Sequence, residues 1–297
     1  MSAEPTGHGT AFARAALAGN PSDGYGGAVL ATTLAARSAT ASAWRSPRPA
    51  IDPPSELVAA TVARFAAECV PAAADATSVR FRTTIPRAVG LGGSSAIVVA
   101  TLRALSELWS VDLAAIETAQ LALRIEVEDL GIAAGLQDRI AQTHEGLTFM
   151  DFGRRPPVAR PLDPGLLPPL VIAWRGDSGG HSGDVHAPLR DRHAGGEPSV
   201  LRGMRTLRRA AHDAADAVAA GDHRTLRSSV DASFDVRRSM LSLDPRHVEM
   251  IEAARAAGAA ANYAGSGGAI VAVCADGPHR DRVRTGLERI SCETLVM

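Results

Sequence analysis

A glycine-rich segment with two serines is the part of this sequence best suited to binding an anion. An extended run ends just before it at Ile85 and Pro86, and apolar residues recur at helical spacing after it, up to Trp109. A glycine-rich loop at a helix N-terminus presents backbone N–H groups to an anion such as phosphate. The segment, which predicts such a loop, consists of Gly90, Leu91, Gly92, Gly93, Ser94, Ser95 and Ala96.

Two other interpretations of this loop compete with anion binding. The loop can be a tight turn between a strand and a helix that binds nothing. A serine nucleophile is disfavoured, because it needs the pattern GxSxG and here Ala96 and Ile97 follow the serines. The lysine of a Walker loop and the GxGxxG spacing of a dinucleotide fold are both missing. A nucleotide would therefore bind this loop in another way.

Acidic residues suited to metal binding or proton transfer lie between Asp112 and Asp138. Helical periodicity, starting from an N-cap at Asp112, predicts a buried stripe of Leu113, Ile116, Leu123, Val127 and Leu130. At about 100° per residue, Glu126 points into this apolar stripe and Glu128 points to water. Because a buried carboxylate needs a partner, Glu126 is expected to bind either a buried arginine or Mg²⁺. Asp138, taken alone, is more typical of a helix N-cap than of a catalytic base.

Composition and charge exclude several classes of protein. The chain has 46% hydrophobic and 21% charged residues, a composition typical of a globular protein. Its 297 residues are enough for two domains of about 150 residues each. The net charge of −1 gives no electrostatic case for binding nucleic acid. The chain contains no lysine, so every cation that the chemistry needs must be an arginine or a protonated histidine.

Cysteine usage and the N-terminal sequence predict a cytoplasmic protein without a membrane partner. The three cysteines, Cys69, Cys274 and Cys292, are odd in number and form no CxxC pair, which disfavours disulfides and a cysteine metal site. The first residues lack the basic patch and apolar run of a signal peptide. No apolar stretch approaches the roughly 18 residues of a membrane span.

Strands and helices alternate in both halves of the chain, which predicts an α+β protein with two lobes. Short apolar runs predict buried strands at Leu170–Trp174 and Ala269–Cys274, and helical periodicity predicts helices at Val200–Ala220, Arg224–Met240 and Val248–Ala257. Six prolines between Gly153 and Pro169 predict a segment without regular structure. We expect the domain boundary there, between a domain at 1–155 and a domain at 168–297.

Three segments, in this order, resemble the signature motifs of the GHMP small-molecule kinases. They read ARAALAGNPSDGYGG, PRAVGLGGSSA and NYAGSGGAIVAV, and they extend over nearly the whole chain. The resemblance implies the GHMP kinase fold, with an N-terminal lobe like ribosomal protein S5 domain 2 and a ferredoxin-like C-terminal lobe. It also implies an enzyme that uses ATP and Mg²⁺ to phosphorylate a small molecule.

The middle motif is one residue longer than the commonest family form, GLGSSA, and this longer form resembles the branch that phosphorylates free sugars at the anomeric hydroxyl. Three further segments resemble the glucuronokinases of that branch most closely, namely LGIAAGLQDRIAQ, GLTFMDF and FDVRRSM. The resemblance implies conversion of glucuronate to glucuronate 1-phosphate. The alternatives are another sugar 1-kinase, acting on a heptose, fucose, arabinose or galactose, and a catalytically silent sensor of sugar and nucleotide.

The same resemblance assigns roles to individual residues. ATP phosphates would bind the Gly90–Ala96 loop, and Ser95 and Glu126 would bind Mg²⁺. Asp138, in GLQD, would accept the proton of the sugar hydroxyl or orient that hydroxyl. Arg14 would stabilise charge on the transferring phosphoryl group. The phosphate end of the ATP site would be closed by a segment of the other lobe, which consists of Gly265, Ser266, Gly267 and Gly268.

Substrate contacts are expected from Asp23 and from one of two adjacent arginines. The resemblance places Asp23 where sugar kinases of this family hold substrate hydroxyls. A uronic acid also carries a carboxylate, which is best bound by an arginine. Arg237 and Arg238 in FDVRRSM are candidates, and both can also lie on a solvated face. Since adjacent helical residues point about 100° apart, at most one of them is expected to face the sugar.

Overall fold

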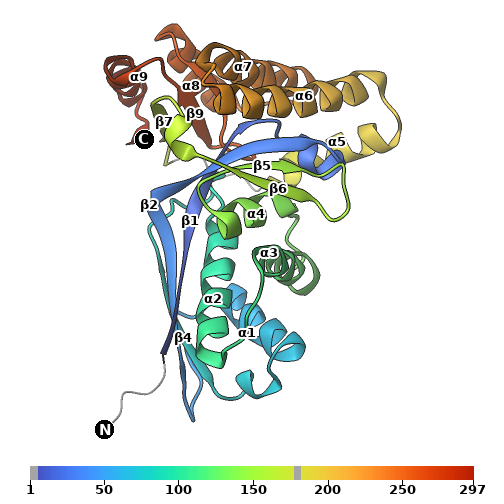
Figure 1. The fold of residues 1–297 in the computed structure, drawn as a ribbon, viewed down its shortest axis with the longest axis vertical. Coiled ribbons are helices and arrows are strands. Elements are labelled where there is room, and N and C mark those ends of the chain that lie inside the picture. Colours follow the sequence, from blue (N-terminus) through green and yellow to red (C-terminus); the bar gives the residue numbers. More distant parts are fainter. Residues whose placement is uncertain (1–5, 177–181) are drawn as a thin grey trace. The chain divides into compact units, whose positions relative to one another are not determined.

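The computed structural model describes residues 6–176 and 182–297 and divides the chain into two compact units (Figure 1). Unit 1 comprises the chain up to Ala13, Thr33–Ile85 and Gly92–Glu145. Unit 2 comprises Arg14–Thr32, Pro86–Leu91 and Gly146–Met297. The long strands β1 (Thr6–Ala18) and β2 (Ala28–Arg45) each pass from one unit into the other. The compact units are therefore not the two consecutive halves of the chain, and the division into 1–155 and 168–297 stays a prediction.

Unit 1 combines a sheet with packed helices. In addition to its parts of β1 and β2, it contains β3 (Ile51–Asp52), α1 (Glu56–Glu68), η2 (Pro71–Ala73), β4 (Thr77–Thr83), α2 (Gly93–Trp109), α3 (Ala115–Arg124), the π-helical turn η3 (Ile125–Asp129) and α4 (Leu136–His144). β4 pairs with β2 in antiparallel register, from Ala39 opposite Thr83 to Arg45 opposite Thr77. Helix α2 approaches β1 so closely that a Cβ at Gly9 would overlap the carbonyl oxygen of Ala100.

The helix that leads to Glu126 differs from the predicted one in its start and in its buried face. It begins after Ala114, whose N–H donates to the Glu117 carboxylate at 2.8 Å, so the prediction of Asp112 as N-cap is wrong. The predicted stripe is also wrong, since Val127 is 42% exposed and the buried positions are Thr118, Ala119, Leu121, Ala122, Ile125 and Glu126. α3 packs between α2 and α4 on its small Ala and Thr side chains, and the π-helical turn then changes the angular step between residues.

Unit 2 contains a four-stranded antiparallel sheet with the strand order β10-β7-β9-β8. Its elements are η1 (Ser22–Tyr25), β5 (Leu147–Asp151), β6 (Val158–Leu162), η4 (Pro164–Leu166), β7 (Leu170–Trp174), α5 (Ser182–Ala194), α6 (Pro198–Ala220), α7 (His223–Met240), α8 (Pro245–Ala256), β8 (Ala260–Tyr263), β9 (Ala269–Val273), α9 (Gly277–Arg289) and β10 (Glu293–Val296). Side chains from β7, β8 and β9 form one core with α7, α8 and α9, including Val171, Phe234, Met250, Tyr263, Ile270 and Leu287. The strands and helices predicted for this half are confirmed to within three residues at each end.

The proline-rich segment contains a strand, which corrects the prediction that it has no regular structure. β6 pairs with β5 in antiparallel register, and Pro161 lies opposite Thr148. β6 is the last strand of its sheet, so the missing N–H of Pro161 can face away from the neighbouring strand. The prediction failed because an edge strand tolerates a proline that a central strand does not.

Membrane-spanning segments were sought among the helices of the described residues. Within 6–176 and 182–297, no helix is both long enough and apolar enough to cross a membrane.

Candidate active site

The Gly90–Ala96 loop connects an extended segment to α2, as predicted. The helix begins at Gly93, inside the segment predicted as the loop, and Gly92 precedes it with a φ of 74° that favours glycine. The buried Ser95 hydroxyl donates to the carbonyl oxygen of Gly92 at 3.1 Å. The first N–H groups of a helix lack acceptors within the helix, so this end of α2 has donors available for an anion.

Gln142, on α4, fixes the loop from within unit 1. Its side-chain amide donates to the carbonyl oxygens of Gly92 at 2.7 Å and Phe12 at 3.1 Å, and the side chain is fully buried. We had no sequence-based reason to select Gln142. Its position four residues after Asp138, on the same face of a helix, is the signal that links it to the candidate site.

Glu126 is fully buried and faces inward, as predicted, and Glu128 faces outward with 54% of its side chain exposed. Oε2 of Glu126 accepts from Nε of Arg139 at 2.9 Å and from Nη2 of the same arginine. The buried-arginine alternative is therefore confirmed. Oε1 of Glu126 is buried and accepts no hydrogen bond from the described residues, so one carboxylate oxygen is left for another ligand.

Asp138 is the third residue of α4 and not its N-cap, which is Gly135. The expectation of an N-cap is therefore wrong, because the helix already begins at Leu136. A carboxylate in the first turn of a helix is stabilised by the partial positive charge there. The Asp138 side chain is partly exposed, as a group that meets a substrate must be.

In unit 2, the glycine-rich segment Gly265–Gly268 forms the turn between β8 and β9. Polar side chains hold the carbonyl groups on this turn. Nη1 of Arg14 donates to Ala264 at 2.8 Å and to Gly90 at 2.7 Å. Arg237 donates to Gly265 at 2.8 Å and to Ser266 at 2.9 Å, and the Asn20 amide donates to Gly265 at 3.2 Å.

These side chains bind carbonyl groups in and beside the turn, and the backbone N–H groups of the turn remain as hydrogen-bond donors. The N–H groups of Gly265, Ser266, Gly267 and Gly268 donate to no acceptor in the described part of the chain. Gly90 lies against the turn so closely that a Cβ there would overlap the carbonyl oxygen of Gly267. Unit 2 thus brings together Arg14, Gly90 and the Gly265–Gly268 turn.

Arg237 and Arg238 occupy opposite environments. Arg237 is fully buried above the ring of Tyr263, 4.9 Å from its centre, and burial lowers the pKa of its guanidinium to about 10. The nearby Asp23 carboxylate acts in the other direction and favours the charged form, so that this pKa would be lower without it. Arg238 is exposed and pairs with Glu252 at 3.1 Å. At most one of the two faces inward, as expected, but the inward arginine binds backbone carbonyl groups.

Asp23 lies in the short helix η1 and is partly buried. Burial raises the pKa of the neighbouring Tyr25, and the Arg190 guanidinium opposes this rise. The Tyr25 ring packs against the His193 ring of α5, with 4.5 Å between ring centres. Asp23 is therefore in an environment that includes Arg237, Tyr25 and α5.

The family description "GHMP kinases N terminal domain" matches residues 56–146, and "GHMP kinases C terminal" matches residues 214–293. The chain belongs to the GHMP kinases. It has the GHMP kinase fold, with mixed helices and sheets.

Relatives of this GHMP kinase include proteins named as sugar kinases. It is 36% identical over 211 residues to Glucuronokinase 1 of Arabidopsis thaliana, and the match covers 68% of this chain and 58% of that protein. It is 44% identical over 75 residues to the D-glycero-alpha-D-manno-heptose 7-phosphate kinase of Campylobacter jejuni, which covers 25% of this chain and 22% of that protein. The chain thus matches less than two thirds of the length of these relatives. Mevalonate kinase of L. major has a similar structure, with a TM-score of 0.80 at 19% identity over 99% of this chain and 97% of that chain.

The donors of this GHMP kinase fit a magnesium ion that also binds phosphate. Oε1 of Glu126 is buried without a hydrogen bond, and the Ser95 hydroxyl uses its proton on Gly92, which leaves its lone pairs. No group of three or more His, Cys, Asp or Glu side chains able to hold a metal occurs in the described residues. Such a sparse set suits Mg²⁺, which usually takes one or two protein oxygens and completes its shell with phosphates and water.

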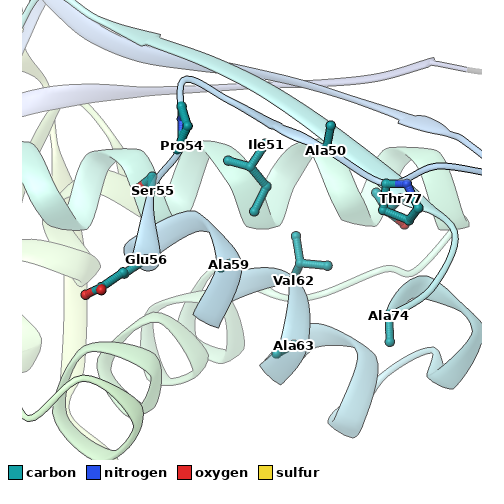
Figure 2. Close-up of a pocket in the computed structure, with 11 residues that line it drawn as sticks. Ala50, Ile51, Pro54, Ser55, Glu56, Ala59, Val62, Ala63, Ala74 and Thr77 are labelled. Carbon is teal, nitrogen blue, oxygen red and sulfur yellow. The ribbon is translucent and has the colours of Figure 1, made fainter.

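A groove in unit 1 lies elsewhere (Figure 2). It has a volume of about 560 Å³ and is lined mainly by apolar side chains of α1 and of the segments around β3, such as Ile51 and Val62. None of the predicted site residues lines it. The groove is therefore not a candidate for the phosphoryl-transfer site.

Proposed function

We propose that this protein is an ATP-dependent sugar kinase that phosphorylates the anomeric hydroxyl of a free sugar, and that glucuronate is its substrate. The observation that carries the proposal is the Gly265–Gly268 turn, where Asn20 and Arg237 bind carbonyl groups of the turn and Arg14 binds that of the adjacent Ala264. The N–H groups of the turn donate to no acceptor within the described residues. A turn held in this way offers several donors to an anion. The similarity to glucuronokinases supports the choice of substrate.

In this proposal, the two glycine-rich segments bind the phosphates of ATP. The Gly90–Ala96 loop adds the N-terminus of α2, with its partial positive charge. Mg²⁺, held by Ser95 and Glu126, would neutralise charge on the phosphates. Phosphoryl transfer depends mainly on such positioning and charge stabilisation, so these backbone donors supply much of what the reaction needs.

Asp138 accepts the proton of the anomeric hydroxyl or orients that hydroxyl toward the γ-phosphoryl group. A carboxylate in this role does not need to contact ATP. Its partial exposure allows it to meet a substrate. Its neighbours Arg139 and Gln142 are engaged with Glu126 and with the loop, so α4 connects the proposed base to the metal ligand and to the phosphate loop.

Arg14 and Asp23 complete the proposed site. The Arg14 guanidinium is 4% exposed and donates to the carbonyl groups of Gly90 and Ala264, and it places positive charge beside both glycine-rich segments. It would stabilise the charge of the transferring group. Asp23 would accept hydrogen bonds from sugar hydroxyls.

A second candidate is a kinase for another sugar, such as a heptose. It is favoured by the 44% identity to a heptose 7-phosphate kinase over 75 residues. A sensor without catalytic activity is disfavoured, because such a protein has no need for both the Glu126 and the Asp138 carboxylates.

The proposed function is tested by measuring ADP release with ATP, Mg²⁺ and a panel of sugars. We expect ADP release with glucuronate to exceed release without sugar and with fucose, arabinose, galactose or a heptose. Preferential release with one of those other sugars would support the second candidate. Release with no sugar, from folded protein that binds ATP, would support the sensor.

A further inference from the structure

A uronic acid needs a cation at its carboxylate, and the two arginines first expected to supply it have other partners. Arg237 is fully buried and uses Nη1 and Nη2 on two carbonyl groups. Arg238 is exposed and pairs with Glu252 at 3.1 Å. The carboxylate of the substrate therefore calls for another arginine near Asp23.

Helix α5 brings one arginine to the Asp23 segment. The ring of His193 packs on Tyr25, two residues after Asp23, with 4.5 Å between ring centres. Arg190 precedes His193 by three residues, so the two side chains point about 60° apart on one side of the helix. Arg190 is also close enough to Tyr25 to oppose the rise in the pKa of that phenol.

Packing fixes the orientation of α5. Leu189 is fully buried in a cluster with side chains of α6 and α7, namely Val200, Met204, Leu207 and Met240. Tyr25 packs against the same cluster. With Leu189 turned inward, Arg190 points about 100° away from it and is exposed.

Unlike the other two arginines, Arg190 has a guanidinium available for a ligand. Its side chain forms no hydrogen bond or ion pair with any residue that the structure describes. An arginine at the edge of a packed surface can bind a carboxylate through two parallel hydrogen bonds.

We propose that Arg190 binds the carboxylate of a uronic acid whose hydroxyl groups are bound by Asp23. This inference rests on the proposed function. The carboxylate is carried by C5 of the pyranose ring, and placing it beside Asp23 would bring two negative charges together. A cation at that point removes the repulsion and distinguishes a uronic acid from the neutral hexose that is otherwise identical.

The test compares glucuronate with glucose, which has the same ring but no carboxylate. We expect Arg190→Ala to raise the KM for glucuronate by about 10- to 100-fold, since a hydrogen-bonded charge pair contributes about 1.5–3 kcal/mol. The inhibition constant or KM for glucose should change less than about threefold. Arg190→Lys should recover part of the affinity, because it keeps the charge and loses the planar fork.

Arg205→Ala is the matched control, because Arg205 is an exposed arginine of the neighbouring helix α6. Arg205→Ala should leave the KM values for glucuronate and for glucose unchanged. Glucuronate binding without ATP is measured by calorimetry in parallel, so that the inference does not depend on turnover. Weak glucuronate binding by the Arg190 variant supports it, whatever the rate of phosphoryl transfer.

Two results would overturn the inference while leaving the sugar kinase in place. The first is that Arg190→Ala leaves the affinity for glucuronate unchanged. The second is that Arg190→Ala lowers the affinities for glucuronate and for glucose by the same factor. If the unmodified protein binds and phosphorylates galactose or fucose far better than glucuronate, both the inference and the assignment of glucuronate are wrong. Absence of phosphoryl transfer to every sugar, together with normal glucuronate binding, contradicts only the proposed activity.

Discussion

Two buried arginines of this protein are stabilised in different ways. Arg139 in unit 1 lies against Glu126, with both side chains at most 4% exposed, so a carboxylate neutralises its charge. Arg237 in unit 2 is fully buried, and among the described residues its terminal nitrogens donate only to the carbonyl groups of Gly265 and Ser266. We call the first a closed pair, because the Glu126 carboxylate neutralises the guanidinium through Oε2, and the second an open cation, because its described hydrogen bonds go to carbonyl groups.

The two arginines therefore differ in the cost of removing them and in the charge that they present to an anion. Removing one side chain of a closed pair strongly destabilises the protein, because the other side chain is left charged and buried. A cation held by carbonyl dipoles costs free energy to bury but attracts an anion that binds nearby. The N–H groups of the Gly265–Gly268 turn, which Arg237 contacts, donate to no acceptor in the part of the chain that the structure describes, so both features favour a phosphate.

The largest effect is expected from breaking the closed pair. Arg139→Ala leaves the Glu126 carboxylate unpaired in the core and should lower the free energy of unfolding by about 3–5 kcal/mol. Urea denaturation monitored by circular dichroism measures this loss. The double variant Arg139→Met with Glu126→Leu should be clearly more stable than Arg139→Ala. Equal losses would show that the two side chains do not act as a pair.

The next largest effect concerns catalysis. Asp138→Asn should lower kcat by about 10²- to 10⁴-fold, because it removes the group proposed to accept the proton of the sugar hydroxyl. The Kd for ATP should remain nearly unchanged, as measured by calorimetry. Near-normal turnover of the variant would exclude Asp138 from the mechanism.

The open cation is tested by comparing its removal with that of its neighbour. Arg237→Met should raise the KM for ATP by roughly tenfold and destabilise the protein by about 1–3 kcal/mol, because two buried carbonyl groups lose their donor. Arg238→Ala should change stability by less than about 0.5 kcal/mol and leave the KM unchanged. Equal effects of the two variants would contradict the contrast between closed and open arginines.

The smallest effects sharpen the assignment of the metal ligands. Ser95→Ala should raise the Mg²⁺ concentration needed for half-maximal activity, because it removes an oxygen ligand from a hard cation. Glu128→Gln, on the exposed side of the same segment as Glu126, should leave that concentration unchanged. A larger shift for Glu128→Gln than for Ser95→Ala would show that the metal ligands are wrongly assigned.

Sequence patterns predicted the elements that are determined by local sequence. They missed the features that depend on contacts with distant segments of the chain. The Gly90–Ala96 loop and the strands of unit 2 follow from glycine placement and apolar periodicity. The inward direction of Glu126 was predicted correctly, although the apolar stripe used to predict it is not the buried face of the helix. The buried stripe of α3 was misplaced because the large apolar residues alone were used to find it, whereas the buried face combines Leu121 with the small residues Thr118, Ala119 and Ala122.

Long-range hydrogen bonds account for the rest of what was missed. Gln142 binds Phe12, which is 130 residues away, and Arg237 binds the carbonyl groups of a turn 28 residues further along the chain. No periodicity reports such contacts, because they depend on which backbone segment packs beneath the side chain. The strand β6 was missed for a similar reason, since its tolerance of Pro161 depends on its place at a sheet edge.

The central claim is phosphoryl transfer from ATP to the anomeric hydroxyl of glucuronate, and phosphorus NMR of the reaction product tests it most directly. The purified protein is incubated with ATP, Mg²⁺ and glucuronate, and the new phosphorus signal is assigned by its coupling to the sugar protons. We expect a single phosphomonoester coupled to the proton on C1, together with an equal amount of ADP. A phosphate on any other hydroxyl, or ATP consumption without a sugar phosphate, would contradict the claim.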